Sequence, residues 1–157
     1  MASSWQKFRR LSRLSRRQLG LALLLLPVTA LAVRLAGVRR WHSLLLHLTP
    51  PGPPPDARGR AFILPRAVAT AHMVKAASRY GPYRANCLQQ SLVLCCLLRR
   101  QGIPGADLRI GMRKNRGMLE AHAWVELGGR PLNDGGDVHR RYYPFDRPIT
   151  IAGAEAS

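Results

Sequence analysis

Hydrophobic and polar positions alternate along residues 121–127, which is the pattern of a β-strand. A strand places His122, Trp124 and Glu126 on one face and the four apolar side chains of the stretch on the other. Gly128-Gly129 follows as a two-residue turn, after which the chain returns as a neighbouring strand. We therefore expect a hairpin with one dry face and one face able to carry out chemistry.

The chain before this hairpin predicts two helices and a further strand. Apolar residues recur at helical spacing in residues 61–80 and 86–101, and Gly102 ends the second helix. Residues 108–113 alternate as a strand, which residues 115–117 turn into the strand of His122. This order predicts an α+β fold in which helices pack on a small antiparallel sheet.

The N-terminal segment, residues 1–49, is rich in leucine and arginine. Residues 19–33 carry no charge, but the run contains Pro27 and is short for a membrane span, which needs about 20 residues. No small-residue cleavage site follows it, so we do not expect a secretory signal. The segment instead predicts a pair of apolar, basic-edged helices that cover the following domain, dock a partner or lie on an anionic membrane surface.

A proline-rich stretch, residues 50–59, cannot continue a helix and predicts a stiff, extended linker. We accordingly expect three parts: residues 1–49 as a helical segment, the linker, and residues 60–157 as the functional domain.

The net charge of +17 is unevenly distributed, because residues 1–60 hold eleven Lys or Arg residues against the single acid Asp56. So basic a chain could be a non-catalytic protein that binds membranes or nucleic acid. No DNA- or RNA-binding motif supports a nucleic-acid partner, and we expect none. The three cysteines include the adjacent pair Cys95-Cys96, which does not suggest a disulfide framework, so a reducing, cytoplasmic setting is expected.

Three residues have the chain order and chemistry of a cysteine catalytic triad: Cys87, His122 and Asp134. Cys87 lies at the start of the second predicted helix, where unpaired N–H groups and the helix dipole favour a thiolate. His122 can take the thiol proton and pass one to a leaving amine, while Asp134, on the returning chain of the hairpin, can orient the imidazole.

Other residues compete for these roles. Asp137 is a rival for the carboxylate, because residues 133–137 also read as a turn in which either aspartate could bond to backbone. Cys95 and Cys96 are expected to be core thiols. Trp124 and Glu126 are expected at the wall and surface of the site rather than in catalysis. The remaining histidines have no metal-ligand spacing with the cysteines, so neither a metal nor another cofactor is expected: His42, His47, His72 and His139.

Several motifs resemble the transglutaminase-like cysteine proteases of lasso-peptide biosynthesis, the B proteins that remove the leader from the precursor peptide. The resemblance covers about residues 60–143 and is carried by Cys87-Leu88 with the leucine-rich helix and by residues 98–104, 108–111 and 121–126. In that family the Cys, the His and an Asp a dozen residues beyond the His form the triad. Here 134 − 122 = 12, so the resemblance implies these roles for Cys87, His122 and Asp134.

The resemblance also implies partners. Some B proteins carry a leader-binding domain ahead of the protease and others are split into two chains. Residues 1–60 contain no strand-rich module, so this chain is similar to the protease half of a split system. Its partners would be the leader region of the precursor, a separate leader-recognition protein and an ATP-dependent cyclase. It would act in the cytoplasm, with possible association at the inner membrane face.

Three functions thus follow from the sequence. The first is a leader peptidase that forms an acyl-enzyme on Cys87 and releases it with water. The second is a transglutaminase-like acyltransferase, which uses the same three residues and resolves the acyl-enzyme with an amine. The third is the non-catalytic basic protein described above.

Overall fold

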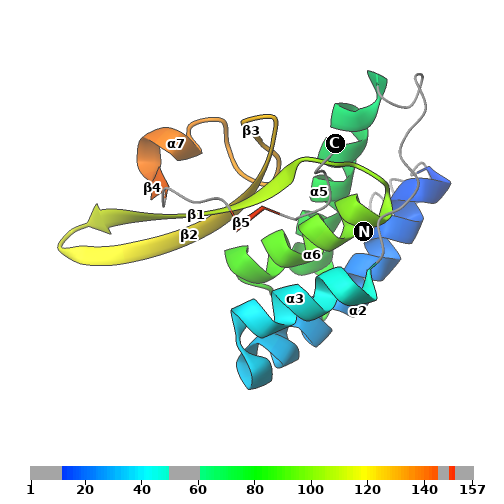
Figure 1. Ribbon diagram of the computed structural model, residues 1–157, viewed down its shortest axis with the longest axis horizontal. Coiled ribbons are helices and arrows are strands. Elements are labelled where there is room, and N and C mark those ends of the chain that lie inside the picture. The colour runs from blue at the N-terminus through cyan, green and yellow to red at the C-terminus, as the bar shows by residue number, and fades with distance from the viewer. Residues whose placement is uncertain (1–11, 50–60, 145–148, 151–157) are drawn as a thin grey trace, which may run out of the picture.

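The computed structural model describes residues 12–49, 61–144 and 149–150. Helices come first and a sheet follows, which confirms the α+β prediction (Figure 1). The helices of four or more residues are α2 (Arg13–Ala36), α3 (Val38–Leu48), α5 (Ile63–Tyr80), α6 (Cys87–Arg100) and the single-turn α7 (Val138–Arg141).

The sheet is antiparallel, with the order β3-β2-β1-β4 and with β5 also paired to β1. Its strands are β1 (Ala106–Asn115), β2 (Met118–Leu127), β3 (Arg130–Pro131), β4 (Tyr143–Pro144) and β5 (Ile149–Thr150). β1 and β2 form a long hairpin that projects beyond the helices (Figure 1). The strand β3, which follows the Gly128-Gly129 turn, has only two residues and is shorter than the neighbouring strand that the sequence predicted.

Both hairpin turns have the geometry expected from their sequences. Arg116 and Gly117 have φ of 47° and 85°, and Gly128 and Gly129 have φ of 58° and 76°. Positive φ at both central residues is the requirement of a type I′ turn, which matches the twist of the flanking strands. The second turn sends the chain back along the edge of β2 toward the predicted carboxylate.

The helix α6 is the centre of the core. A capping box starts it: the Asn86 side chain accepts from the Gln89 N–H at 2.9 Å, and the Gln89 side chain accepts from the Asn86 N–H at 3.1 Å. Its leucines at positions 92, 94, 97 and 98 are almost fully buried. The helix contacts α2 and α5 on one side and β1 and β2 on the other. The helix begins at Cys87 and ends at Arg100, one residue inside the predicted range of 86–101 at each end.

The predicted pair of N-terminal helices is present as α2 and α3. The side chains of Ala22 and Leu26 on α2 lie in the same core cluster as those of α5 and α6. α2 is also long and apolar enough to cross a membrane by length and composition alone, a test that core helices and signal sequences pass as well. The predicted linker at 50–59 lies outside the described residues, but the core includes side chains from both sides of it.

Candidate active site

His122 and Asp134 are brought together by the hairpin turn and the short β3 strand. The Nε2 atom of His122 is hydrogen-bonded to Oδ2 of Asp134. The other carboxylate oxygen, Oδ1, accepts from the Gly135 N–H at 2.6 Å and from Nη2 of Arg141 at 2.8 Å. The carboxylate is thus held from two sides, and Nδ1 is the imidazole nitrogen left for a second proton partner.

The environment of Asp134 favours its ionised form. Partial burial raises the pKa of this carboxyl, but the hydrogen bonds from Gly135, His122 and Arg141 together outweigh it and lower the pKa below its ordinary value. An ionised carboxylate at this place holds the imidazole in one orientation and stabilises its positive charge.

Asp137, the competing carboxylate, lies elsewhere. Its Oδ2 pairs with Nε of Arg141 at 3.0 Å, and its side chain is 61% exposed. Within the described part of the chain, Asp134 is the carboxylate that contacts the His122 ring. Arg141 bridges the two aspartates and so fixes the loop that carries Asp134.

Aromatic rings hold the imidazole of His122 in place. The Tyr142 ring stacks on it at a centroid distance of 4.8 Å, and the Trp124 ring at 6.1 Å. Trp124, Tyr142 and Val138 form a second small buried cluster on this face of β2. Opposite His122 on β1 is Gly111, where a Cβ would come within 2.9 Å of the Trp124 ring. A glycine is therefore needed for the tryptophan to lie beside His122.

Glu126, expected at the surface, is instead 4% exposed. Its Oε1 accepts from the Trp124 indole at 2.6 Å, and Nε2 of His139 lies 3.3 Å from the same oxygen. Nε of Arg109 is 3.2 Å from Oε2. The prediction for Glu126 was wrong because period-two alternation places polar residues on a face without revealing that α7 covers that face. Glu126 anchors Trp124, which in turn packs beside His122.

The three cysteines differ in accessibility. Cys87 is partly exposed, while Cys95 and Cys96 are buried in the core as expected. Burial raises the pKa of the Cys95 thiol far above its ordinary value, with the neighbouring Cys96 adding to the effect, and burial also raises the pKa of Cys96. Buried, protonated thiols are poor nucleophiles, so Cys87 is the thiol suited to chemistry.

Helix α6 meets the His122 strand one turn after Cys87. The Ser91 hydroxyl donates to the Ala123 carbonyl at 3.2 Å and accepts from Nδ2 of Asn133 at 3.0 Å. Oδ1 of Asn133 accepts from the Val125 N–H at 2.8 Å. These bonds lie along the edge of β2 away from β1, where the Leu132 N–H also donates to the Val125 carbonyl. They tie the helix of Cys87, the strand of His122 and the residue before Asp134 into one unit.

The distribution of the three residues around β2 follows from these contacts. His122 lies on the α7 side of β2, and α6 packs against the other side, with the edge of β2 that faces away from β1 between them (Figure 1). Four residues of helix rise separate Cys87 from Ser91, about 6 Å. No hydrogen bond joins Cys87 to His122 among the residues that the structure describes. The structure thus brings His122 and Asp134 into contact and places Cys87 one helical turn before the contact of Ser91 with the His122 strand.

A model of the Transglutaminase-like superfamily matches residues 22–146. The chain belongs to this superfamily. Neither a search of curated proteins nor one of solved structures gives a significant match. The transglutaminase-like superfamily includes cysteine peptidases and acyltransferases and is usually catalytic, so membership agrees with a thiol-based site.

The sequence predicted no role in the site for four residues that the structure places there: Ser91, Asn133, Arg141 and Tyr142. The sequence places Asn133 on the returning strand or in the turn of residues 133–137 but does not show its bond to Ser91, and nothing in the sequence marks the loop of Arg141 as returning to Asp134. Gly111 did carry a signal, since a glycine inside a strand often marks a close approach. Among the described residues, no group of His, Cys, Asp and Glu side chains could hold a metal ion.

Proposed function

We propose that this protein is a cysteine peptidase that removes the leader from a lasso-peptide precursor. The observation that carries the proposal is the His122–Asp134 pair, joined through Asn133 and Ser91 to the helix that starts at the partly exposed Cys87. Superfamily membership supports the thiol chemistry. The choice of a lasso precursor rests on the motif resemblance around Cys87, His122 and residues 98–104.

In the proposed reaction, the Cys87 sulfur attacks the carbonyl carbon of the scissile peptide bond. His122 takes the thiol proton on Nδ1 and delivers it to the leaving amine, while Asp134 holds the ring and stabilises the imidazolium. The backbone N–H of Cys87, at the positive end of α6, donates to the developing oxyanion. Water then attacks the thioester, which frees the carboxylate product and the thiol.

Proton transfer requires the thiol and Nδ1 to come within hydrogen-bond distance. Such contacts are often long in substrate-free enzymes and shorten in the Michaelis complex. In this proposal the substrate carbonyl lies between Cys87 and His122. A separate leader-recognition protein presents the precursor, and an ATP-dependent cyclase takes the exposed product.

The experiment is to incubate the purified chain with a lasso precursor peptide, with and without a leader-recognition protein, and to measure product masses. Cleavage into leader and core with addition of water supports the peptidase. The incubations also contain a primary amine. A product in which this amine has replaced the leaving group identifies acyl transfer on the same three residues. An unchanged precursor in both incubations contradicts the proposal.

A further inference from the structure

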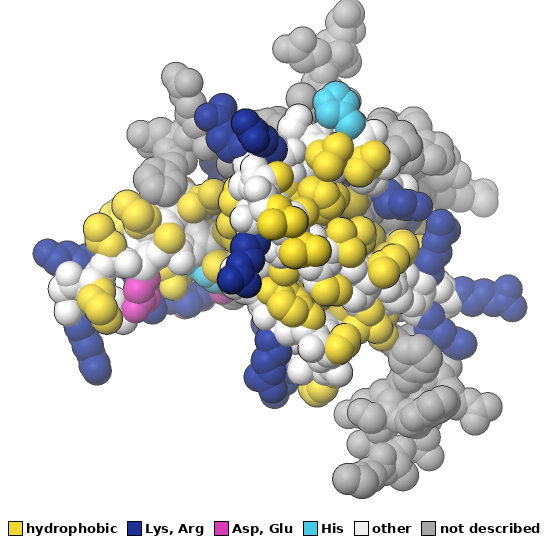
Figure 2. All heavy atoms as spheres, turned by 90° about the horizontal axis from the view of Figure 1, so that it is seen from below, with side chains coloured by type: hydrophobic (Ala, Val, Ile, Leu, Met, Phe, Trp, Pro, Cys, Tyr) yellow, Lys and Arg dark blue, Asp and Glu magenta, His cyan; other side chains and the backbone are white. Residues whose placement is uncertain are grey.

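The two N-terminal helices present an apolar surface on the side away from the core. We call it the apolar face; its large side chains range from 42% exposed for Val28 to 77% for Leu35, and they are Leu24, Val28, Leu31, Leu35, Leu44 and Leu48. Ala22, Leu26 and Thr29, on the opposite side of α2, are buried. Figure 2, which views the molecule from the side of α2 and α3 in Figure 1, shows a broad area of hydrophobic side chains.

The charged residues of α2 and α3 all have one sign. No acidic residue occurs between Met1 and Pro55. Arg13 and Arg17 are exposed and precede Leu24 at helical spacing, so they extend the same stripe. Exposed arginines at positions 34, 39 and 40 lie at the other end of α2 and in α3. Lys and Arg side chains accordingly surround the hydrophobic area in Figure 2, and the acidic side chains in that view lie away from it.

We propose that the apolar face binds the surface of an anionic lipid bilayer. The leucines enter the boundary between headgroups and acyl chains, and the arginines contact the lipid phosphates. A lipid surface fits this combination of side chains, because leucines on one helix stripe with arginines around them and no acidic residue from Met1 to Pro55 match the apolar and cationic parts of helices that lie on anionic bilayers. The proposal goes beyond the peptidase activity and does not depend on it.

The packing of α2 favours binding at the surface over crossing the bilayer. A spanning α2 would have to leave α5 and α6, which would uncover the core side chains now packed against Ala22 and Leu26. Lying in the interface plane, the helix keeps that contact and buries only its outer stripe. Basic residues at both ends of the apolar run fit this orientation.

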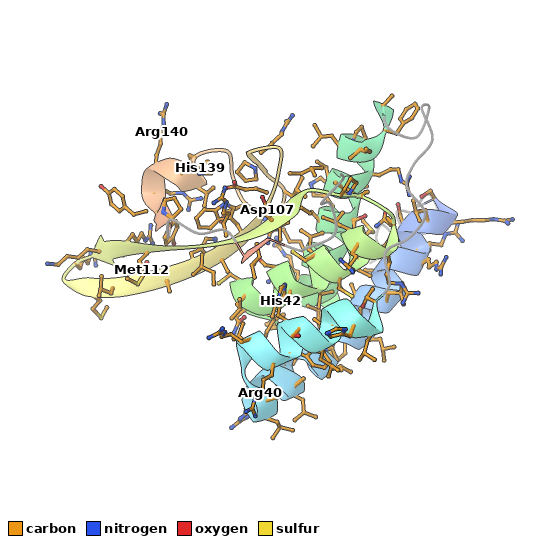
Figure 3. All side chains as sticks on the ribbon, in the orientation of Figure 1. Arg40, His42, Asp107, Met112, His139 and Arg140 are labelled. Carbon is orange, nitrogen blue, oxygen red and sulfur yellow. The ribbon has the colours of Figure 1, made fainter. Side chains whose placement is uncertain are left out.

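The orientation leaves the candidate active site accessible. Figure 3 labels Arg40 on α3 and His139 on α7 at opposite sides of the molecule, with α6 and the sheet between them. His139 packs against Trp124, the neighbour of His122. A bilayer under α2 and α3 therefore faces away from His122, and a soluble peptide can reach the site of the bound protein.

The test is flotation of the full chain with vesicles of phosphatidylglycerol and phosphatidylcholine, compared with phosphatidylcholine alone. We expect binding to the anionic vesicles and release at high salt. Replacing Leu24, Leu31 and Leu35 by serine weakens binding by roughly tenfold or more, since apolar insertion is lost. Replacing Arg34, Arg39 and Arg40 by glutamine weakens it by roughly a hundredfold, because each basic residue contributes about fivefold.

The matched control replaces Met118 and Leu119 by serine. Their side chains are similarly exposed, at 69% and 70%, but lie at the tip of the hairpin. We expect this control variant to bind the vesicles as the wild type does. Thermal melting checks that every variant is folded. Equal loss of binding in the control overturns the proposal. The absence of binding to anionic vesicles also overturns it and would leave a protein partner for this face. Binding that resists both high salt and alkaline extraction would mean instead that α2 spans the bilayer.

Discussion

At the scale of single residues, the site depends on which carboxylate orients His122. The turn chemistry of residues 133–137 left Asp134 and Asp137 in competition, and the two differ by only three positions. The contact between Nε2 of His122 and Asp134 distinguishes them geometrically, while Asp137 pairs with Arg141. The chemistry attached to this contact can be tested by paired substitutions.

We expect Asp134→Asn to fold and to lose most of its cleavage rate, by up to about 10⁴-fold, the size of the loss when the carboxylate of a serine-protease triad is replaced. The reason is that an amide neither fixes the same imidazole tautomer nor stabilises its positive charge. Asp137→Asn is the matched control and keeps a rate near that of the wild type. Steady-state kinetics of the two variants would contradict the assignment if Asp137→Asn were inactive and Asp134→Asn unaffected.

The lowered pKa of Asp134 also predicts a dependence of stability on pH. A carboxyl whose pKa is lower in the folded than in the unfolded protein contributes stability above the unfolded value and loses it as the pH falls through the folded value. The free energy of unfolding of the wild type should therefore exceed that of Asp134→Asn near neutral pH. Denaturant titrations at decreasing pH should show the gap closing; a gap that widens in acid would contradict the hydrogen-bonding account.

At the scale of elements, the strand of His122 is positioned by the Asn133 bridge. Asn133→Ala leaves the buried hydroxyl of Ser91 and the N–H of Val125 each without one partner. We expect a loss of about 1–3 kcal/mol in the free energy of unfolding, the cost of unpaired buried polar groups. The cleavage rate should fall in addition, because the bridge holds the helix of Cys87 against the His122 strand.

Asn115→Ala is the control for this prediction, because its Nδ2 bonds Glu120 at 2.9 Å near the exposed end of the same hairpin. It should change stability by less than about 0.5 kcal/mol, as is usual for surface substitutions. Equal effects of the two variants on cleavage would mean that the Asn133 bridge has no special role in placing the site.

Helix α2 provides a second prediction at this scale. Leu26→Ala should lower the free energy of unfolding by about 2–5 kcal/mol, because Leu26 is 1% exposed and lies in the core shared with α5 and α6. Leu31→Ala on the same helix, at 60% exposure, should change it by less than about 0.5 kcal/mol. Equal and small effects would show that α2 is an appendage to the folded domain.

Most elements could be predicted from the sequence because their signals are local. The glycine turns at 116–117 and 128–129, the helical pattern that begins at residue 86, and the stop at Gly102 each act within a few positions. The burial of Glu126 and the return of Arg141 to Asp134 depend on α7 folding over the sheet. Contacts of this kind between separate elements leave no periodic pattern in the chain, so they could not be predicted from it.

At the scale of the whole molecule, the helices and the sheet carry different features. α6 connects the two, since its leucines pack in the core while its first residue is the candidate nucleophile. The N-terminal helices close the core on one side and carry the basic, apolar surface. The face of β2 under α7 carries the His122–Asp134 pair. The two proposals thus place the chemistry and the membrane contact on opposite sides of the molecule.

The central claim is that the protein acts through the Cys87 thiol. The most direct measurement is the cleavage rate of a lasso precursor, in the presence of a leader-recognition protein, by the wild type, Cys87→Ala and Cys95→Ala. We predict that the wild type and Cys95→Ala cleave the precursor, while Cys87→Ala keeps its fold and shows no cleavage, because removing the nucleophile eliminates the covalent route. Cleavage by Cys87→Ala at the rate of the wild type would contradict the account.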